Sequence, residues 1–132
     1  MTTARPIVVV DDNPEIRTLL TRILAKHGFA TASADGGPAL RAILAEQPAA
    51  LIVMDVMMPG EDGLTLCRWI HDVAPTPVIL ISARAGDRHR REALDAGAVE
   101  YVEKPFDPKR LVQRIRSILT DPATPGGQPG GQ

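Results

Sequence analysis

The sequence contains few aromatic residues and a single cysteine. Its aromatic residues are Phe29, Trp69, Tyr101 and Phe106, too few to form the base-stacking platform of a single-strand nucleic-acid-binding protein. The lone cysteine, Cys67, excludes an internal disulfide framework and a metal site made only of cysteines. Any chemistry must therefore come from polar and charged side chains.

Charge of one sign and long apolar runs are also missing. Fifteen Lys and Arg residues balance sixteen Asp and Glu residues, for a net charge of −1. We therefore expect no direct nucleic-acid binding and no membrane attachment, because no strong overall field supports either. The apolar runs fall far short of the roughly 20 residues of a membrane span. Met1–Pro6 lack the apolar core of a signal peptide, so a cytoplasmic location is expected.

The composition changes near residue 120. Hydrophobic residues make up 44% of the chain, enough for the core of one domain. In contrast, residues 121–132 are mostly Pro and Gly and contain no large apolar residue. Such a segment buries too little surface to offset its ordering entropy. We predict a folded domain over residues 1–120, followed by a flexible Pro/Gly-rich tail or interdomain linker over residues 121–132.

Short apolar runs alternate with helical patterns in the folded part. Residues 7–10, 51–54 and 78–81 are continuous apolar runs, typical of strands buried on both faces, and 30–34 and 99–103 are weaker strand candidates. Apolar residues at helical spacing follow each run, as in Ile16, Leu19, Leu20, Ile23 and Leu24. Five strand–helix units in succession predict an α/β fold with a parallel sheet covered by helices on both faces.

Polar residues follow four of the five predicted strands. Asp11 and Asp12 follow the first run, Asp55 the third, Ser82 the fourth and Lys104 the fifth. Ligands of open α/β sheets bind beyond the carboxyl ends of the strands, so these side chains are expected to converge. Three clustered carboxylates repel one another unless a cation lies between them, and Mg²⁺ is the natural ion because it prefers oxygen ligands. Mg²⁺ also keeps several water ligands, which leaves room for a phosphoryl group.

At these positions the sequence resembles the receiver domain of two-component response regulators. The matching motifs are VVVDD at 8–12, VMDVMMPGEDGL at 53–64, ISAR at 81–84, and residues 97–106 from Gly-Ala to Lys-Pro-Phe. Together the motifs extend the resemblance over residues 5–120. It implies a doubly wound (βα)5, flavodoxin-like three-layer sandwich with a five-stranded parallel sheet.

The resemblance implies a phosphorylation-activated signalling switch. Asp55 would accept a phosphoryl group from a sensor histidine kinase, a phosphotransfer protein or a small phosphodonor. Lys104 and Ser82 would contact the phosphate oxygens, and Pro105 would follow Lys104 through a cis peptide bond. Phosphorylation would draw Ser82 inward and Tyr101 would follow, which changes the surface of the fourth helix, fifth strand and fifth helix toward an output domain or partner.

The resemblance also implies Mg²⁺ as the cofactor. Asp12 would bind the ion directly, Asp11 through water, and Asp55 and the backbone carbonyl of Met57 would complete the protein ligands. Met57 and Arg84 also bear on the lifetime of the phosphoryl group. An apolar side chain at position 57 cannot orient a water, and a long Arg84 side chain would cover the phosphate. We therefore expect self-dephosphorylation over minutes or longer.

A dimer through the same surface is left open. The family that the sequence resembles includes receivers that form dimers through reciprocal salt bridges across a two-fold axis. The pairs that would form are Glu100 with Arg114 and Asp95 with Arg116. Arg90 would, however, meet the like charge of Arg110, and Val99 stands where an Asp is usual. Surface ion pairs are individually weak, so the pattern does not decide for homodimerisation on phosphorylation.

Three alternatives compete with the receiver interpretation. An Asp-dependent phosphohydrolase requires a second carboxylate two residues after Asp55, where this sequence has Met57. It usually also requires a cap domain, for which the chain is too short. A nucleotide-binding protein wants a phosphate-binding glycine motif after the first strand, which is missing. A degenerate receiver would lack part of the Asp, Ser and Lys set. We therefore expect a protein that assists its own phosphorylation but is not an enzyme with a separate substrate.

Overall fold

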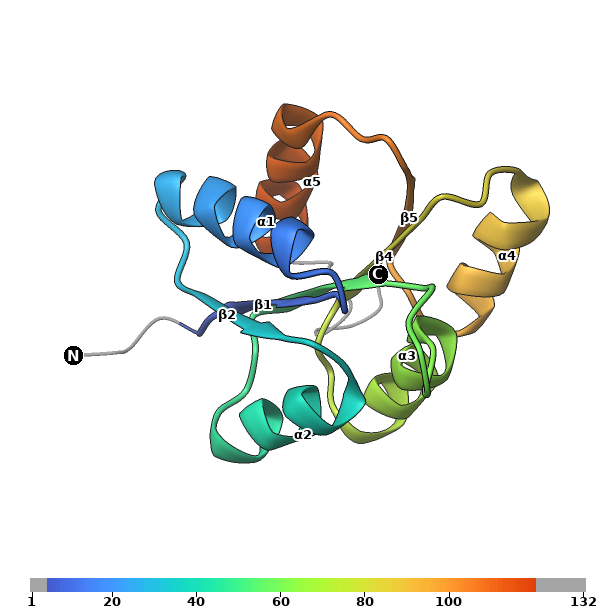
Figure 1. The fold of residues 1–132 in the computed structure, drawn as a ribbon, viewed down its shortest axis with the longest axis horizontal. Coiled ribbons are helices and arrows are strands. Elements are labelled where there is room, and N and C mark those ends of the chain that lie inside the picture. The colour runs from blue at the N-terminus through green and yellow to red at the C-terminus, as the bar shows by residue number, and fades with distance from the viewer. Residues whose placement is uncertain (1–4, 121–132) are drawn as a thin grey trace.

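The chain folds as five strand–helix units (Figure 1). The computed structural model describes residues 5–120, so the predicted tail or linker at 121–132 lies outside the described residues. The strands are β1 (Ile7–Val10), β2 (Thr31–Ala34), β3 (Leu51–Asp55), β4 (Val78–Ser82) and β5 (Glu100–Glu103). The helices are α1 (Pro14–Lys26), α2 (Gly37–Glu46), α3 (Gly63–Val73), α4 (Asp87–Asp95) and α5 (Pro108–Thr120). Every predicted element is present.

The five strands form one parallel sheet in the order β2-β1-β3-β4-β5. The three continuous apolar runs become the three central strands, and every residue of these strands is buried. Both edge strands contain partly exposed residues and begin one residue later than predicted, at Thr31 and Glu100. The doubly wound (βα)5 class inferred from the sequence is confirmed.

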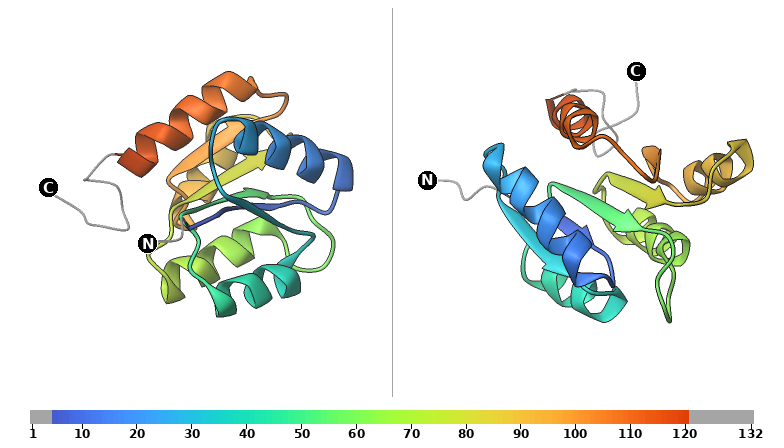
Figure 2. Two further views of the ribbon diagram at one scale, coloured as in Figure 1. Left: turned by 90° about the vertical axis from the view of Figure 1, so that its left-hand side faces the viewer. Right: turned by 45° about the horizontal axis from the view of Figure 1, so that its top comes forward.

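Helices cover both faces of the sheet and complete three layers (Figure 2). The core under α1 and α5 contains the side chains of Val9 and Val53, whereas α2, α3 and α4 pack on the other face against Val8 and Met54. Alternate residues of one strand therefore enter different cores, which explains why these strands are apolar throughout. Cys67 lies in the second core, where burial raises the pKa of its thiol to about 11.

The starts of α1 and α3 are set by local side-chain chemistry at the carboxyl edge of the sheet. The Asn13 side chain accepts a hydrogen bond from the amide of Glu15 and so caps α1, with Pro14 in the first turn. The side chain of Asp62 caps α3 in the same way, through the amide of Thr65. These caps fix how the loops after β1 and β3 leave the sheet.

Within residues 5–120, no helix is long and apolar enough to cross a membrane.

Candidate functional site

Two carboxylates meet where β1 and β3 end. Val10 pairs with Met54 across the two strands, so the next residues, Asp11 and Asp55, lie side by side. Both are buried, at 3% and 7% exposure, whereas Asp12 is exposed. One oxygen from each of the three carboxylates lies within 4.8 Å of the other two. The predicted acidic cluster is therefore present as a compact group of three carboxylates.

Contacts from α1 hold Asp11 in place. The amide of Asn13 donates to Asp11 Oδ1 at 2.9 Å, and the Arg17 guanidinium donates to the Asp11 carbonyl oxygen at 2.7 Å. The turn that begins α1 thus orients the Asp11 side chain. Arg17, one turn further along the helix, holds the Asp11 backbone. Sequence reasoning did not find Arg17, because nothing in its spacing distinguishes it from an ordinary exposed helix residue.

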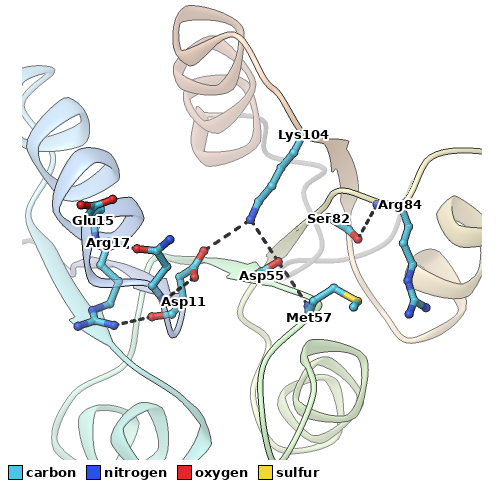
Figure 3. A network of polar contacts seen from close by, with 9 residues as sticks. Asp11, Glu15, Arg17, Asp55, Met57, Ser82, Arg84 and Lys104 are labelled. Carbon is cyan, nitrogen blue, oxygen red and sulfur yellow. Dashed lines mark hydrogen bonds and ion pairs between the residues drawn. The ribbon is translucent and has the colours of Figure 1, made fainter.

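Lys104 reaches the carboxylates from the end of β5 (Figure 3). Its Nζ lies 3.6 Å from Asp55 Oδ1 and 3.9 Å from Asp11 Oδ2. The Lys104 amide donates to the Ser82 carbonyl oxygen at 2.8 Å, which ties the lysine backbone to the end of β4. The Lys104–Pro105 peptide bond is cis, the isomer that the resemblance implies. One ammonium group therefore faces both buried carboxylates.

The surroundings of Asp55 raise the pKa of its carboxyl. Burial raises the pKa of the Asp55 carboxyl above its ordinary value, and this effect exceeds the opposing attraction of Lys104. The neighbouring Asp11 raises the pKa of Asp55 further, whereas a hydrogen bond from the Met57 amide to Asp55 Oδ1 at 3.4 Å lowers it. Lys104 thus offsets only part of the effect of burial on the pKa of Asp55.

The donor set fits a hard divalent cation. The cluster holds three carboxylates, and Lys104 contacts only Asp11 and Asp55, so positive charge is still missing there. Carboxylate oxygens are the ligands that Mg²⁺ prefers, and an ion bound by few protein ligands keeps water in its other positions. The residues present therefore suit Mg²⁺. The backbone of Met57 lies beside this cluster, because its amide donates a hydrogen bond to Asp55.

The raised pKa of Asp55 leads to a stability prediction for metal-free protein. A carboxyl whose pKa is higher in the folded than in the unfolded state costs stability once it ionises. Below the unfolded value of about 3.9 the cost is zero, and it grows until the pH passes the folded pKa. Asp55→Asn should therefore raise the denaturation midpoint at pH 7 in chelator, and the gain should vanish near pH 3. A gain independent of pH in urea titrations would contradict this origin.

A chain of backbone and side-chain contacts leads from Ser82 to Tyr101. The Ser82 hydroxyl accepts from the Arg84 amide at 3.1 Å, and the Tyr101 hydroxyl donates to the Arg84 carbonyl oxygen. Tyr101 is 3% exposed, so its ring lies inside the domain. The Arg90 guanidinium lies over that ring, 5.9 Å from its centroid. Two residues singled out in the sequence, Ser82 and Tyr101, are thus connected through the backbone of a third.

Other residues singled out in the sequence lie elsewhere. The Arg84 side chain points away from Asp55, so it does not cover the site in this structure (Figure 3). Glu100 and Arg114 form an ion pair at 3.0 Å within the chain. Arg116 donates to the His27 carbonyl oxygen at 2.9 Å. Both arginines of the suggested dimer pairs therefore have partners inside one molecule. Asp95, the suggested dimer partner of Arg116, is the last residue of α4.

Comparison with known proteins decides the family. Residues 7–116 match the family described as "response regulator receiver domain". The chain belongs to this family. Receiver domains act as phosphorylation-controlled switches in two-component systems, where they interact with histidine kinases and phosphotransfer proteins. The resemblance inferred from the sequence motifs is confirmed.

Relatives of this receiver domain include bacterial regulators. It is 44% identical to Protein PetR of Rhodobacter capsulatus over 113 residues, which are 86% of this chain and 48% of PetR. It is 42% identical to the transcriptional regulatory protein GltR of Pseudomonas aeruginosa over 118 residues, 87% of this chain and 49% of GltR. The chain thus spans about half the length of these relatives.

Solved structures support the same fold. The BeF3-activated N-terminal receiver domain of Klebsiella pneumoniae RstA superposes with a TM-score of 0.83 at 32% identity, covering 89% of this chain and all of that one. The receiver domain of NtrX from Brucella abortus gives a TM-score of 0.81 at 31% identity, covering 87% and 98%. This receiver domain therefore shares its architecture with receiver domains of known structure.

Proposed function

We propose that Asp55 is the phosphoacceptor of this receiver domain and that Mg²⁺ and Lys104 assist the transfer. The observation that carries the proposal is the position of Lys104 Nζ, 3.6 Å from the buried Asp55 and 3.9 Å from Asp11, which form a group of three carboxylates with Asp12. A buried nucleophile beside a cation and an oxygen-ligand cluster suits phosphoryl transfer, which depends mainly on positioning and electrostatic stabilisation.

The proposed step needs an ionised Asp55. A carboxylate oxygen of Asp55 attacks phosphorus, and the P–N bond to the histidine of the kinase or phosphotransfer protein breaks as the O–P bond forms. Lys104 neutralises charge on the phosphoryl oxygens, and Ser82 donates its hydroxyl to another oxygen. Mg²⁺, when bound, would supply further positive charge. Its proposed ligands are Asp11 through water, Asp12, Asp55 and the Met57 carbonyl.

The proposed output passes through Tyr101. When Ser82 turns toward a phosphoryl group, its hydrogen bond with the Arg84 amide is lost, and the Arg84 carbonyl that holds the Tyr101 hydroxyl is free to shift. Tyr101 borders a groove of about 560 Å³ between β5 and α5, next to α4. We propose this α4–β5–α5 surface as the one that controls an output domain or partner. A reciprocal dimer there would require the Glu100–Arg114 pair to open.

We further propose the receiver domain over residues 1–120, with residues 121–132 as tail or interdomain linker. Their Pro/Gly-rich composition supports this. Relatives twice as long include transcriptional regulatory proteins, so an output domain of that class is the proposed context. We propose a cytoplasmic location, where a kinase partner has access to ATP, and no direct nucleic-acid or membrane binding by these residues.

Incubation with Mg²⁺ and acetyl phosphate tests the proposed function. A receiver should gain one phosphoryl group per chain by intact mass and bind a beryllium fluoride complex at the same residue. Continuous release of phosphate would instead indicate a phosphohydrolase. Failure to bind either reagent would indicate a degenerate module that acts without phosphorylation.

Met57 is expected to prolong the phosphorylated state. Its side chain is 48% exposed beside Asp55 and offers no polar atom that orients an attacking water. Met57→Asn supplies such a group, so dephosphorylation should become about tenfold faster, equivalent to about 1.4 kcal/mol in the barrier. Phosphate-affinity gels after removal of the phosphodonor measure the decay.

Val73→Asn provides the matched control for this change. Val73 is also an exposed apolar residue, 58% exposed at the end of α3, and it lies outside the site. Its substitution should leave the decay at the wild-type value of minutes or longer. Wild-type decay within seconds, or equal decay in Met57→Asn and wild type, would refute the assigned role of Met57.

A further inference from the structure

An ion pair links α2 to the loop that follows β3. Arg41 of α2 donates two parallel hydrogen bonds to Glu61, from the two guanidinium nitrogens to the two carboxylate oxygens, each at 2.7 Å. The side chains are 37% and 30% exposed, so the pair lies at the surface with part of its area covered. Bidentate geometry fixes the orientation of both groups, unlike a single long contact.

Two neighbouring residues shape the place where the pair forms. The Arg41 guanidinium lies over the ring of Trp69 on α3, 4.8 Å from its centroid. Gly37 leaves the space that the pair fills, because a Cβ at this position would lie 2.6 Å from Glu61 Oε1 and 2.9 Å from an Arg41 nitrogen. Stacking and the missing side chain both favour the paired arrangement. The contact thus joins α2, α3 and the loop between β3 and α3.

The loop held by Glu61 runs from Val56 to Asp62 and carries Met57. Two backbone hydrogen bonds of 2.9 Å anchor its ends. The Val56 amide donates to the Ile81 carbonyl oxygen, and the Gly63 amide donates to the Val56 carbonyl oxygen. Between these anchors the Met57 amide donates a long hydrogen bond of 3.4 Å to Asp55. That bond is weak enough to depend on how the rest of the loop is held.

We propose that the Arg41–Glu61 ion pair is a positioning device that holds the loop 56–62 so that the Met57 backbone faces Asp55. The inference rests on the proposed function, in which Met57 supplies a ligand to Mg²⁺. Loss of the pair frees the middle of the loop, so the Met57 amide is released from Asp55 more often and the metal-ligand set is preorganised less well. Arg41 and Glu61 touch neither the phosphoryl group nor the metal in this scheme.

Substitution of both partners tests the positioning role. We expect Arg41→Met and Glu61→Gln each to speed hydrogen exchange of the Met57 amide in metal-free protein by about fivefold, the scale of a partly exposed ion pair. The Kd for Mg²⁺ should weaken by a similar factor, and Trp69 fluorescence should change in Arg41→Met. The double variant should match the single ones, because both remove the same interaction.

A matched control is the other surface ion pair, Glu100–Arg114. Arg114→Met breaks a contact of 3.0 Å far from the loop and should leave Met57 exchange and the Kd for Mg²⁺ unchanged. If Arg41→Met keeps wild-type Met57 exchange, the positioning inference is wrong. If wild-type protein binds no Mg²⁺ and gains no phosphoryl group, the proposed function is wrong, while exchange in the metal-free variants still decides about the ion pair.

Discussion

Asp55→Asn is expected to abolish phosphoryl acceptance. Asp55 is the buried carboxylate nearest to Lys104, and an amide oxygen at this position is too weak a nucleophile to displace the kinase histidine. The substitution keeps the size of the side chain and removes a charge whose burial is unfavourable, so the domain should remain folded. Intact mass after incubation with acetyl phosphate and Mg²⁺ should show one phosphoryl group on wild type and none on the variant.

Asp72→Asn is the matched control for this experiment. Asp72 is exposed on α3, away from the acidic cluster, and the same chemical change there should leave phosphorylation at the wild-type level. If Asp55→Asn still gains one phosphoryl group, the acceptor is a different residue and the proposed site is wrong. If both variants lose it, the loss does not depend on the buried position of Asp55, and the specific acceptor role of Asp55 is wrong.

The sequence predicted the fold well where burial is uniform. Residues 7–10, 51–54 and 78–81 are apolar throughout because each lies between two helix layers, and such runs have few other structural interpretations. The edge strands were less well defined, since Thr31 and Glu100 are partly exposed and their residues need not be apolar. Their starts were therefore misplaced by one residue.

The acidic cluster was also predictable, for a topological reason. Parallel strands end at one edge of the sheet, so polar residues that terminate successive apolar runs must converge there. The pairing of Val10 with Met54 brings Asp11 and Asp55 together, and β5 adds Lys104. Nothing beyond the order of the runs and the residue after each one was needed for this inference.

Contacts between distant side chains could not be predicted in the same way. Arg41 and Glu61 are 20 residues apart, and neither belongs to a repeating pattern that would indicate a partner. Within one chain, Arg116 donates to the carbonyl oxygen of His27, 89 residues away, a contact that the suggested pair with Asp95 of a second copy does not indicate. The direction of a long charged side chain depends on which neighbours the tertiary fold supplies, and a local pattern carries no information about them.

The second large effect is expected from Lys104→Met. Lys104 is the cation that contacts both Asp11 and Asp55, and loss of one preorganised charge at a phosphoryl-transfer site costs about 100-fold or more in rate. The ammonium group also lowers the pKa of Asp55 against the effect of burial, so its removal should raise that pKa further. Less Asp55 is then ionised at a given pH, and the pH–rate curve for acetyl phosphate should move to higher pH.

Lys109→Met separates this effect from a general loss of positive charge. Lys109 is exposed in the first turn of α5, so its neutralisation should leave the rate unchanged. The positive end of the helix dipole slightly disfavours a cation there, so the stability should stay the same or rise slightly. Lys104→Met should instead destabilise metal-free protein at neutral pH, because two buried carboxylates lose their shared counter-ion. The destabilisation should disappear in acid, where the carboxylates are protonated. A rate loss with an unshifted pH profile would mean that Lys104 contacts the phosphodonor without controlling the ionisation of Asp55.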